Sequence, residues 1–163
     1  MKRRFNVFLS FALSMGFFVS CENYNSQTET VTTSFEKRIT TISDFDSLES
    51  GTSYLSVYSQ IYGKTEERIY DLTATVSLRN TSEKETLYIH SAEYFNTQGK
   101  LIKEYVSKSV EIRPLETIEI VIHENDAKRG TGANFIFDWS IDKSAPEPIF
   151  ECVTKANGTV IYI

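Results

Sequence analysis

The sequence predicts an all-β protein, an antiparallel immunoglobulin-like β-sandwich of about 7 to 9 strands. Three observations predict it. Apolar and polar residues alternate with a period of two from residue 53 onward, turn-forming residues separate these runs at close spacing, and no run has the apolar period of an amphipathic helix. The composition, 40% hydrophobic and 24% charged, is typical of a globular domain. A small β-barrel is the alternative architecture.

The first element is a predicted export signal at residues 1–20. Lys2, Arg3 and Arg4 precede sixteen uncharged residues that include five phenylalanines, and Cys21 and a polar stretch follow. A basic start followed by a short apolar run is the order of a secretion signal. Because a spanning helix needs about 20 apolar residues, a permanent transmembrane anchor is the weaker interpretation.

The end of that run, Phe18-Val19-Ser20-Cys21, resembles the lipobox of bacterial lipoproteins, with Phe18 where leucine is usual. The resemblance implies cleavage before Cys21, a diacylglycerol on its thiol and a fatty acid such as palmitate on its new amino group. Each buried CH2 group stabilises membrane binding by about 0.8 kcal/mol, so these chains would hold the protein at a membrane. The alternative is a disulfide between Cys21 and Cys152 in a soluble secreted protein.

Residues 21–50 are predicted to form a lipid-bearing Cys21 and a flexible tether. Residues 22–50 include five serines and six threonines, and their apolar residues are isolated from one another. Such a composition buries too little surface to offset the entropy lost on ordering. The alternative is a short strand around residues 35–42 that docks on the domain.

The β-sandwich domain is expected at residues 51–163. Three core strands are predicted from their alternating apolar residues, which are Leu72, Ala74, Val76 and Leu78; Ile118, Ile120 and Ile122; and Phe135, Phe137, Trp139 and Ile141. In residues 86–95 the apolar positions change parity, which predicts a β-bulge near His90 and Ser91.

Two turns are predicted from their residue types. Residues 96–100 read as a hairpin loop in which Gly99 has a positive φ angle. Asn157-Gly158 is a strong signal for a two-residue hairpin turn. It would join the strand that contains Cys152 to a C-terminal strand at residues 159–163.

Four segments, taken in this order, resemble the bacterial family catalogued as domain of unknown function 3124. They are residues 72–81, the hairpin at residues 94–101, Ile112-Arg113-Pro114-Leu115, and Gly130-Thr131-Gly132-Ala133-Asn134-Phe135. The resemblance covers most of residues 53–163. It implies an exported bacterial domain, and it supplies no catalytic residues to carry over.

Few residues of the predicted domain could support catalysis. His90, His123 and Cys152 are its histidines and cysteine, and we expect Cys152 to pack as a small buried hydrophobe. The sequence has no zinc-helix motif, nucleophile elbow or phosphate-binding loop. We therefore predict no enzyme activity, metal or cofactor. The net charge of -5 also argues against nucleic-acid binding.

Three tyrosines form the main candidate binding feature. Tyr54, Tyr58 and Tyr62 share one parity, whereas Leu55, Val57 and Ile61 have the other. If the aliphatic residues face the core, the tyrosines form an exposed aromatic stripe, which suits a protein partner or sugar rings. The alternative is that loops or a neighbouring strand bury them.

The loop at residues 123–134 is the second candidate. Its two glycines and Asn134 favour a structural role, in which Asn134 ties the loop to itself. The alternatives are a Ca²⁺ site at residues 124–126 and an anion site at residues 128–132.

The leading functional hypothesis is a non-enzymatic binding module, anchored by lipid in the bacterial cell envelope and facing the periplasm or the cell surface. Its expected partners are the membrane, through the lipid, and an envelope protein. The alternative is a carbohydrate or cell-wall binding domain. The candidate binding residues are Tyr54, Tyr58, Tyr62 and Asn134.

Overall fold

The computed structural model describes residues 35–42, 44–123, 131–156 and 159–162. In these residues the chain forms eleven strands, and every pairing between them is antiparallel. The all-β prediction is confirmed. The expected number of strands was too low, because short strands of three residues lack a readable alternation. These are β2 (Gln60–Tyr62), β3 (Ile69–Asp71) and β7 (Val110–Ile112).

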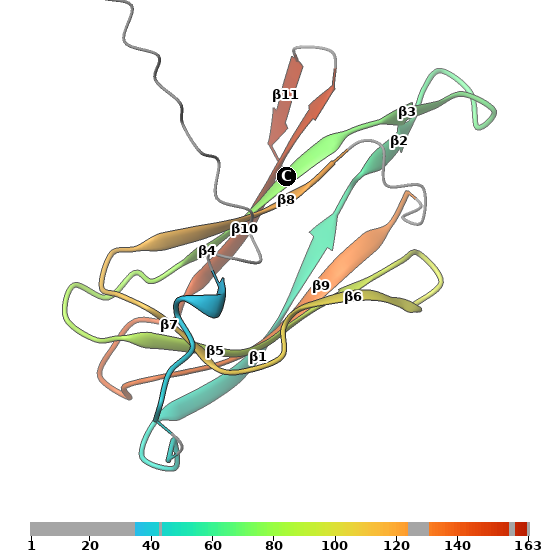
Figure 1. Ribbon diagram of the computed structural model, residues 1–163. Coiled ribbons are helices and arrows are strands. Elements are labelled where there is room, and N and C mark those ends of the chain that lie inside the picture. The colour runs from blue at the N-terminus through green and yellow to red at the C-terminus, as the bar shows by residue number, and fades with distance from the viewer. Residues whose placement is uncertain (1–34, 43, 124–130, 157–158, 163) are drawn as a thin grey trace, which may run out of the picture.

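Two sheets face one another, and the β2–β3 hairpin projects from one end of the sandwich (Figure 1). The first sheet has the order β1 (Glu49–Val57), β9 (Ala133–Ile141), β5 (Leu87–Phe95) and β6 (Leu101–Val106), and β7 also pairs with β5. The second sheet has the order β11 (Thr159–Tyr162), β10 (Ile149–Ala156), β4 (Thr73–Arg79) and β8 (Thr117–Ile122).

The core lies between the two sheets and contains every residue predicted for it from the alternation. Aromatic rings run through it in a stacked series. The centroid distances are 4.8 Å for Tyr94 to Phe135, 5.2 Å for Phe135 to Phe137 and 4.4 Å for Phe137 to Phe150. Because Phe150 belongs to β10 and the other three belong to the first sheet, this series joins the two sheets.

The strand order differs from that of an immunoglobulin domain. In that fold the first strand lies beside the second. Here β1 pairs with β9 instead. The β-sandwich is therefore shown, but the immunoglobulin-like order is not. Alternation in a sequence specifies which face of a strand is buried, whereas it does not specify the neighbouring strand.

The predicted bulge and the first predicted turn are confirmed. The pairing of β5 with β9 shifts register between Ile89 and Ser91. Gly99 has a φ of 73° in the loop between β5 and β6. Asn157 and Gly158 lie outside the described residues, and β10 pairs with β11 on either side of them.

The segment that precedes β1 packs on the domain, and we call residues 35–42 and 44–48 the strap. Phe35 is buried in the core, and Ile39 forms an isolated bridge with Val110 of β7. Backbone hydrogen bonds of 2.9 Å join Thr40 N to the Ser109 oxygen and Glu111 N to the Arg38 oxygen. The predicted tether through residue 50 is therefore wrong from Phe35 onward, because isolated apolar residues find buried sites that their spacing does not reveal.

Gly51 allows β1 to lie close to a large side chain of β9. A Cβ atom at this position would come within 2.4 Å of the Trp139 ring. The indole nitrogen of Trp139 donates a hydrogen bond of 2.9 Å to Ser53 Oγ. Ser53, Leu55 and Val57 consequently face inward, which places the alternate residues of β1 on the opposite face.

Candidate binding surface

The first sheet has an outer face that is turned away from the core. On β9 the inward residues are Phe135, Phe137, Trp139 and Ile141, all buried. The alternate residues Asn134, Ile136, Asp138 and Ser140 therefore belong to the outer face, together with Thr52, Tyr54 and Ser56 of β1. Its two halves differ in what lies over them.

One half of the outer face has an exposed residue, Tyr54, among four half-buried ones, and we define this open half as Tyr54, Glu93, Phe95, Asn134 and Ile136. Ile136 pairs with Tyr54 on one side and with Glu93 on the other, and Asn134 pairs with Phe95. Tyr54 is 65% exposed. Since diagonal neighbours on paired strands lie roughly 7–8 Å apart, Tyr54 and Asn134, two of the predicted residues, occupy the same patch.

The other two predicted tyrosines are also exposed, but they do not continue β1. Tyr58 is 38% exposed and lies just beyond the end of β1, and Tyr62 is 56% exposed and ends β2. The exposure considered for the tyrosines is therefore confirmed, whereas the single strand carrying all three is wrong. The strand is interrupted at the buried Ser59, between β1 and β2.

Tyr62 belongs to the projecting hairpin. It pairs with Ile69, which is also exposed, and its hydroxyl accepts a hydrogen bond of 3.3 Å from Thr131 Oγ1. An open hollow of about 630 Å³ is lined by residues 62–67. Its walls carry charges of both signs from one short loop, so it offers no set of convergent polar groups of the kind that ligand sites use.

The start of β9 is fixed by contacts with the neighbouring loops. The amide of Gly132 donates a hydrogen bond of 2.9 Å to Thr97 Oγ1, in the hairpin between β5 and β6. Asn134 lies within β9 and on the open half. Its predicted role of tying the loop to itself stays a prediction, because most of that loop lies outside the described residues. Residues 124–130, which carry the Ca²⁺ hypothesis and most of the anion hypothesis, lie outside the described residues.

The other half of the outer face is covered by the strap. The ring of Phe45 lies 5.3 Å from that of Tyr88 and 4.6 Å from that of His90, both in edge-on geometry. Ser140, beneath them, is fully buried. We call Tyr88, His90 and Ser140 the covered half.

His90 makes two hydrogen bonds beneath this cover. Its Nδ1 lies 2.9 Å from Ser109 Oγ, and its Nε2 lies 2.8 Å from Ser140 Oγ. Burial lowers the pKa of His90, and the nearby carboxylate of Asp138 opposes this shift. The lowered pKa favours the neutral imidazole, in which one ring nitrogen donates and the other accepts.

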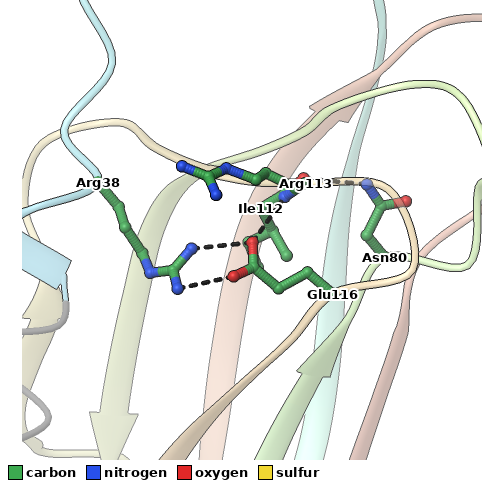
Figure 2. Close-up of polar contacts among 5 residues, drawn as sticks. All are labelled: Arg38, Asn80, Ile112, Arg113 and Glu116. Carbon is green, nitrogen blue, oxygen red and sulfur yellow. Dashed lines mark hydrogen bonds and ion pairs between the residues drawn. The ribbon is translucent and has the colours of Figure 1, made fainter.

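The strap is also held by an ion pair with the loop between β7 and β8 (Figure 2). Arg38 donates two hydrogen bonds to the Glu116 carboxylate, at 2.9 and 2.7 Å, and Arg113 N donates a third at 2.9 Å. The hydrogen bond from Arg38 is the main cause that lowers the pKa of Glu116. Nearby, Asn80 Nδ2 donates to the Ile112 oxygen at 3.0 Å.

The sequence analysis missed this ion pair. Arg38 and Glu116 are 78 residues apart, and nothing in the surrounding pattern links them. A bidentate arginine–carboxylate pair has a defined geometry, so it fixes the position of the strap relative to the loop between β7 and β8.

Cys152 lies in the core on β10, as expected. Burial raises the pKa of its thiol to about 11, so the reactive thiolate is scarce at neutral pH. Cys21 lies outside the described residues, and the disulfide hypothesis with it. Within the described ranges, no three His, Cys, Asp or Glu side chains are placed to hold a metal ion.

The comparisons with known proteins concern the domain. No helix in the described parts of the chain is long and apolar enough to cross a bilayer. No curated protein and no solved structure matches the chain. Residues 50–160 match the family described as "Protein of unknown function (DUF3124)", which confirms the resemblance seen in four sequence segments, and the chain belongs to this family.

Proposed function

We propose that this protein is a non-enzymatic binding module, anchored by lipid in the bacterial cell envelope, and that the open half is its binding surface. One observation carries the proposal. The strap covers one half of the outer face, whereas the other half leaves the ring of Tyr54 mostly exposed beside Ile136, its partner on β9.

The chemistry of the open half suits a protein partner. Tyrosine and phenylalanine are enriched in protein interfaces, where a few large side chains provide most of the binding energy. Glu93 and Asn134 place a carboxylate and an amide beside the apolar residues, so a partner would find hydrogen-bonding groups next to an apolar centre. The β-strands beneath make this surface rigid, which lowers the entropy lost on binding.

The location rests on the sequence. A basic start, an apolar run and a cysteine at its end support export and lipidation at Cys21. The intact mass of protein extracted from membranes tests this proposal, with a Cys21→Ser variant as the control. We expect a mass increase from acyl chains that the variant lacks. An unmodified mature chain in the soluble fraction would contradict the lipid anchor.

A second candidate function is carbohydrate or cell-wall binding. The observation that favours it is the exposed ring of Tyr54 on the same sheet face as Asn134 and Glu93. Sugar rings stack on aromatic faces, and their hydroxyl groups bond to amide and carboxylate oxygens.

Cross-linking in living cells tests the surface and separates the two candidates. Benzoylphenylalanine replaces Tyr54 in one variant and Ile149 in a control, because Ile149 is 49% exposed but lies in the second sheet. A recurrent protein adduct at Tyr54 alone supports the leading function, and a glycan adduct there supports the second. Equal adducts at both positions, or none at Tyr54, would contradict a binding surface on the open half.

A further inference from the structure

The loop between β7 and β8 contains an unusual turn. The amide of Glu116 donates a hydrogen bond of 3.0 Å to the oxygen of Arg113, Pro114 follows Arg113, and Leu115 has a φ of 58°. Proline at the second position and a positive φ at the third define a type II turn, in which the third residue is usually glycine or asparagine. Leucine is strained in this conformation because its Cβ atom approaches its own carbonyl oxygen.

Packing within the domain does not compensate this strain. Leu115 is 67% exposed, slightly more than Tyr54. A large apolar side chain on a strained backbone therefore contacts mainly water. Strained residues persist where the surroundings fix them, and they gather at functional sites.

The turn is held rigidly from several sides. The amide of Leu115 donates to the oxygen of Ser82 at 3.0 Å, and the amide of Asn80 donates to the oxygen of Glu116 at 3.0 Å. The Glu116 side chain is fixed by Arg38 of the strap. The Leu115 side chain is thus presented outward from a defined position.

The strap brings the chain onto the domain at this same end. Arg38, three residues after Phe35, holds the turn through Glu116. Only 13 residues lie between Cys21 and Phe35. They span at most about 50 Å when extended, and on the order of 20 Å as a flexible chain. A lipid on Cys21 would therefore keep this end of the sandwich near the bilayer.

The projecting β2–β3 hairpin, which carries Tyr62, lies at the other end. β8 begins at Thr117, directly after the turn, and ends at Ile122. Thr131, on the far side of the loop that follows, bonds to Tyr62 of the projecting hairpin. In Figure 1 this hairpin and the loop between β7 and β8 lie at opposite ends of the molecule.

We propose that the turn at Leu115 docks on the lipid surface that holds the anchor, with the leucine side chain among the acyl chains. This inference rests on the lipid anchor of the proposed function. Arg113, which is exposed in the same turn, would meet the phosphate of a headgroup. One leucine binds a bilayer weakly, but the anchor supplies a high effective concentration, so docking needs little added affinity. Docking orients the domain so that Tyr54 and Tyr62 face away from the membrane.

Quenching by brominated lipids tests the docking. The full lipidated protein is placed in vesicles of phosphatidylethanolamine and phosphatidylglycerol with brominated acyl chains. Tryptophan replaces Leu115 in one variant and Tyr62, which is 56% exposed, in the matched control. The wild-type protein supplies the background signal of the buried Trp139. We expect at least twofold stronger quenching, and a blue-shifted emission, at position 115.

The other outcomes distinguish a failure of the docking from a failure of the lipid anchor. Vesicle flotation shows whether the protein is anchored. Protein that floats but shows equal quenching at positions 115 and 62 overturns the docking and leaves the anchor intact. Protein that does not float overturns the anchor and the docking together. Benzoylphenylalanine at position 115 that captures a protein in cells, rather than lipid, also overturns the docking.

A second variant tests whether Leu115 serves membrane docking or the stability of the fold. Glycine adopts a positive φ without strain, so Leu115→Gly should raise the melting temperature of the protein in detergent. The same variant in the cell should give a domain that proteases digest more readily at the membrane, because it is no longer held there. A lower melting temperature would show that Leu115 supports the fold, and it would overturn the inference.

Discussion

The two halves of the outer face use the same strands and the same alternation, and they differ in what lies over them. In the covered half, Phe45 of the strap lies on Tyr88 and His90, and Ser140 is fully buried. In the open half, the ring of Tyr54 meets solvent. The parity of a residue therefore shows which face of the sheet it lies on. Its exposure also depends on whether another segment of the chain covers that face.

The hydrogen bonding of the polar residues in each half matches the degree to which that half is buried. The buried hydroxyl of Ser140 bonds to the half-buried His90, as buried polar groups generally find a partner. Between the halves, the exposed carboxylate of Asp138 accepts hydrogen bonds from Thr52 at 2.7 Å and from Ser91 at 2.8 Å. Along β9, the hydrogen-bonded polar residues are therefore buried at Ser140 and exposed at Asp138. The open half begins beyond Asp138.

The largest effect is expected from removing the buried residue that fixes the strap. Phe35→Ala should lower the free energy of unfolding by about 3–5 kcal/mol, because a buried ring leaves a cavity. The exposed Ile39 in the same strap is the control, and Ile39→Ala should cost under about 1 kcal/mol. Urea unfolding measures both. Equal losses would mean that the strap is not held through Phe35.

A smaller loss is expected from breaking the polar pairing of the covered half. His90→Phe keeps a ring under Phe45 but leaves the buried hydroxyl of Ser140 without its partner, at a cost of about 1–3 kcal/mol. Ser91→Ala removes a hydrogen bond in the exposed region beside it and should cost less than about 1 kcal/mol. Thermal or urea unfolding of the two variants ranks them. A larger loss for Ser91→Ala would contradict the dry environment assigned to His90.

The covered half should also make stability depend on pH. Because burial lowers the pKa of His90 below its ordinary value of 6.5, the unfolded chain takes up this proton before the folded protein does. Stability from this group is complete above pH 6.5 and is lost as the pH falls below it. The dependence should shrink in Phe45→Ala, which exposes the imidazole. Unfolding measured from pH 7.5 to 5.5 tests this, and an unchanged dependence in the variant would contradict the role of Phe45 as cover.

The sequence was sufficient for the parts of the fold that depend on local patterns. The buried faces of β4, β8 and β9, the bulge in β5 and the turn at Gly99 each follow from residues close together in the chain. The strap and the pairing of β1 with β9 depend on partners far away. Arg38 and Glu116 illustrate this, since each reads as an ordinary surface charge until the fold joins them.

The sequence predicted only part of the candidate surface. The parity of the tyrosines allowed either face to be buried, and the inward positions of Leu55 and Val57 decided it. Asn134 was chosen for a loop role, yet the pairing of β1 with β9 places it beside Tyr54. The positive φ of Leu115 was not predicted, because leucine usually avoids this conformation and the Pro-Leu pair does not indicate it.

The smallest effect on stability is expected in the open half, and it has the largest bearing on function. Tyr54→Ala should change the free energy of unfolding by no more than about 0.5 kcal/mol, because an exposed side chain loses little packing. Phe45→Ala, on the other half of the same face, should cost clearly more. If Tyr54→Ala also abolishes adducts from a cross-linker placed at Ile136, the open half is kept apolar for a partner rather than for the fold. A loss above 2 kcal/mol would instead make Tyr54 part of the stabilising structure, and the contrast between the two halves would fail.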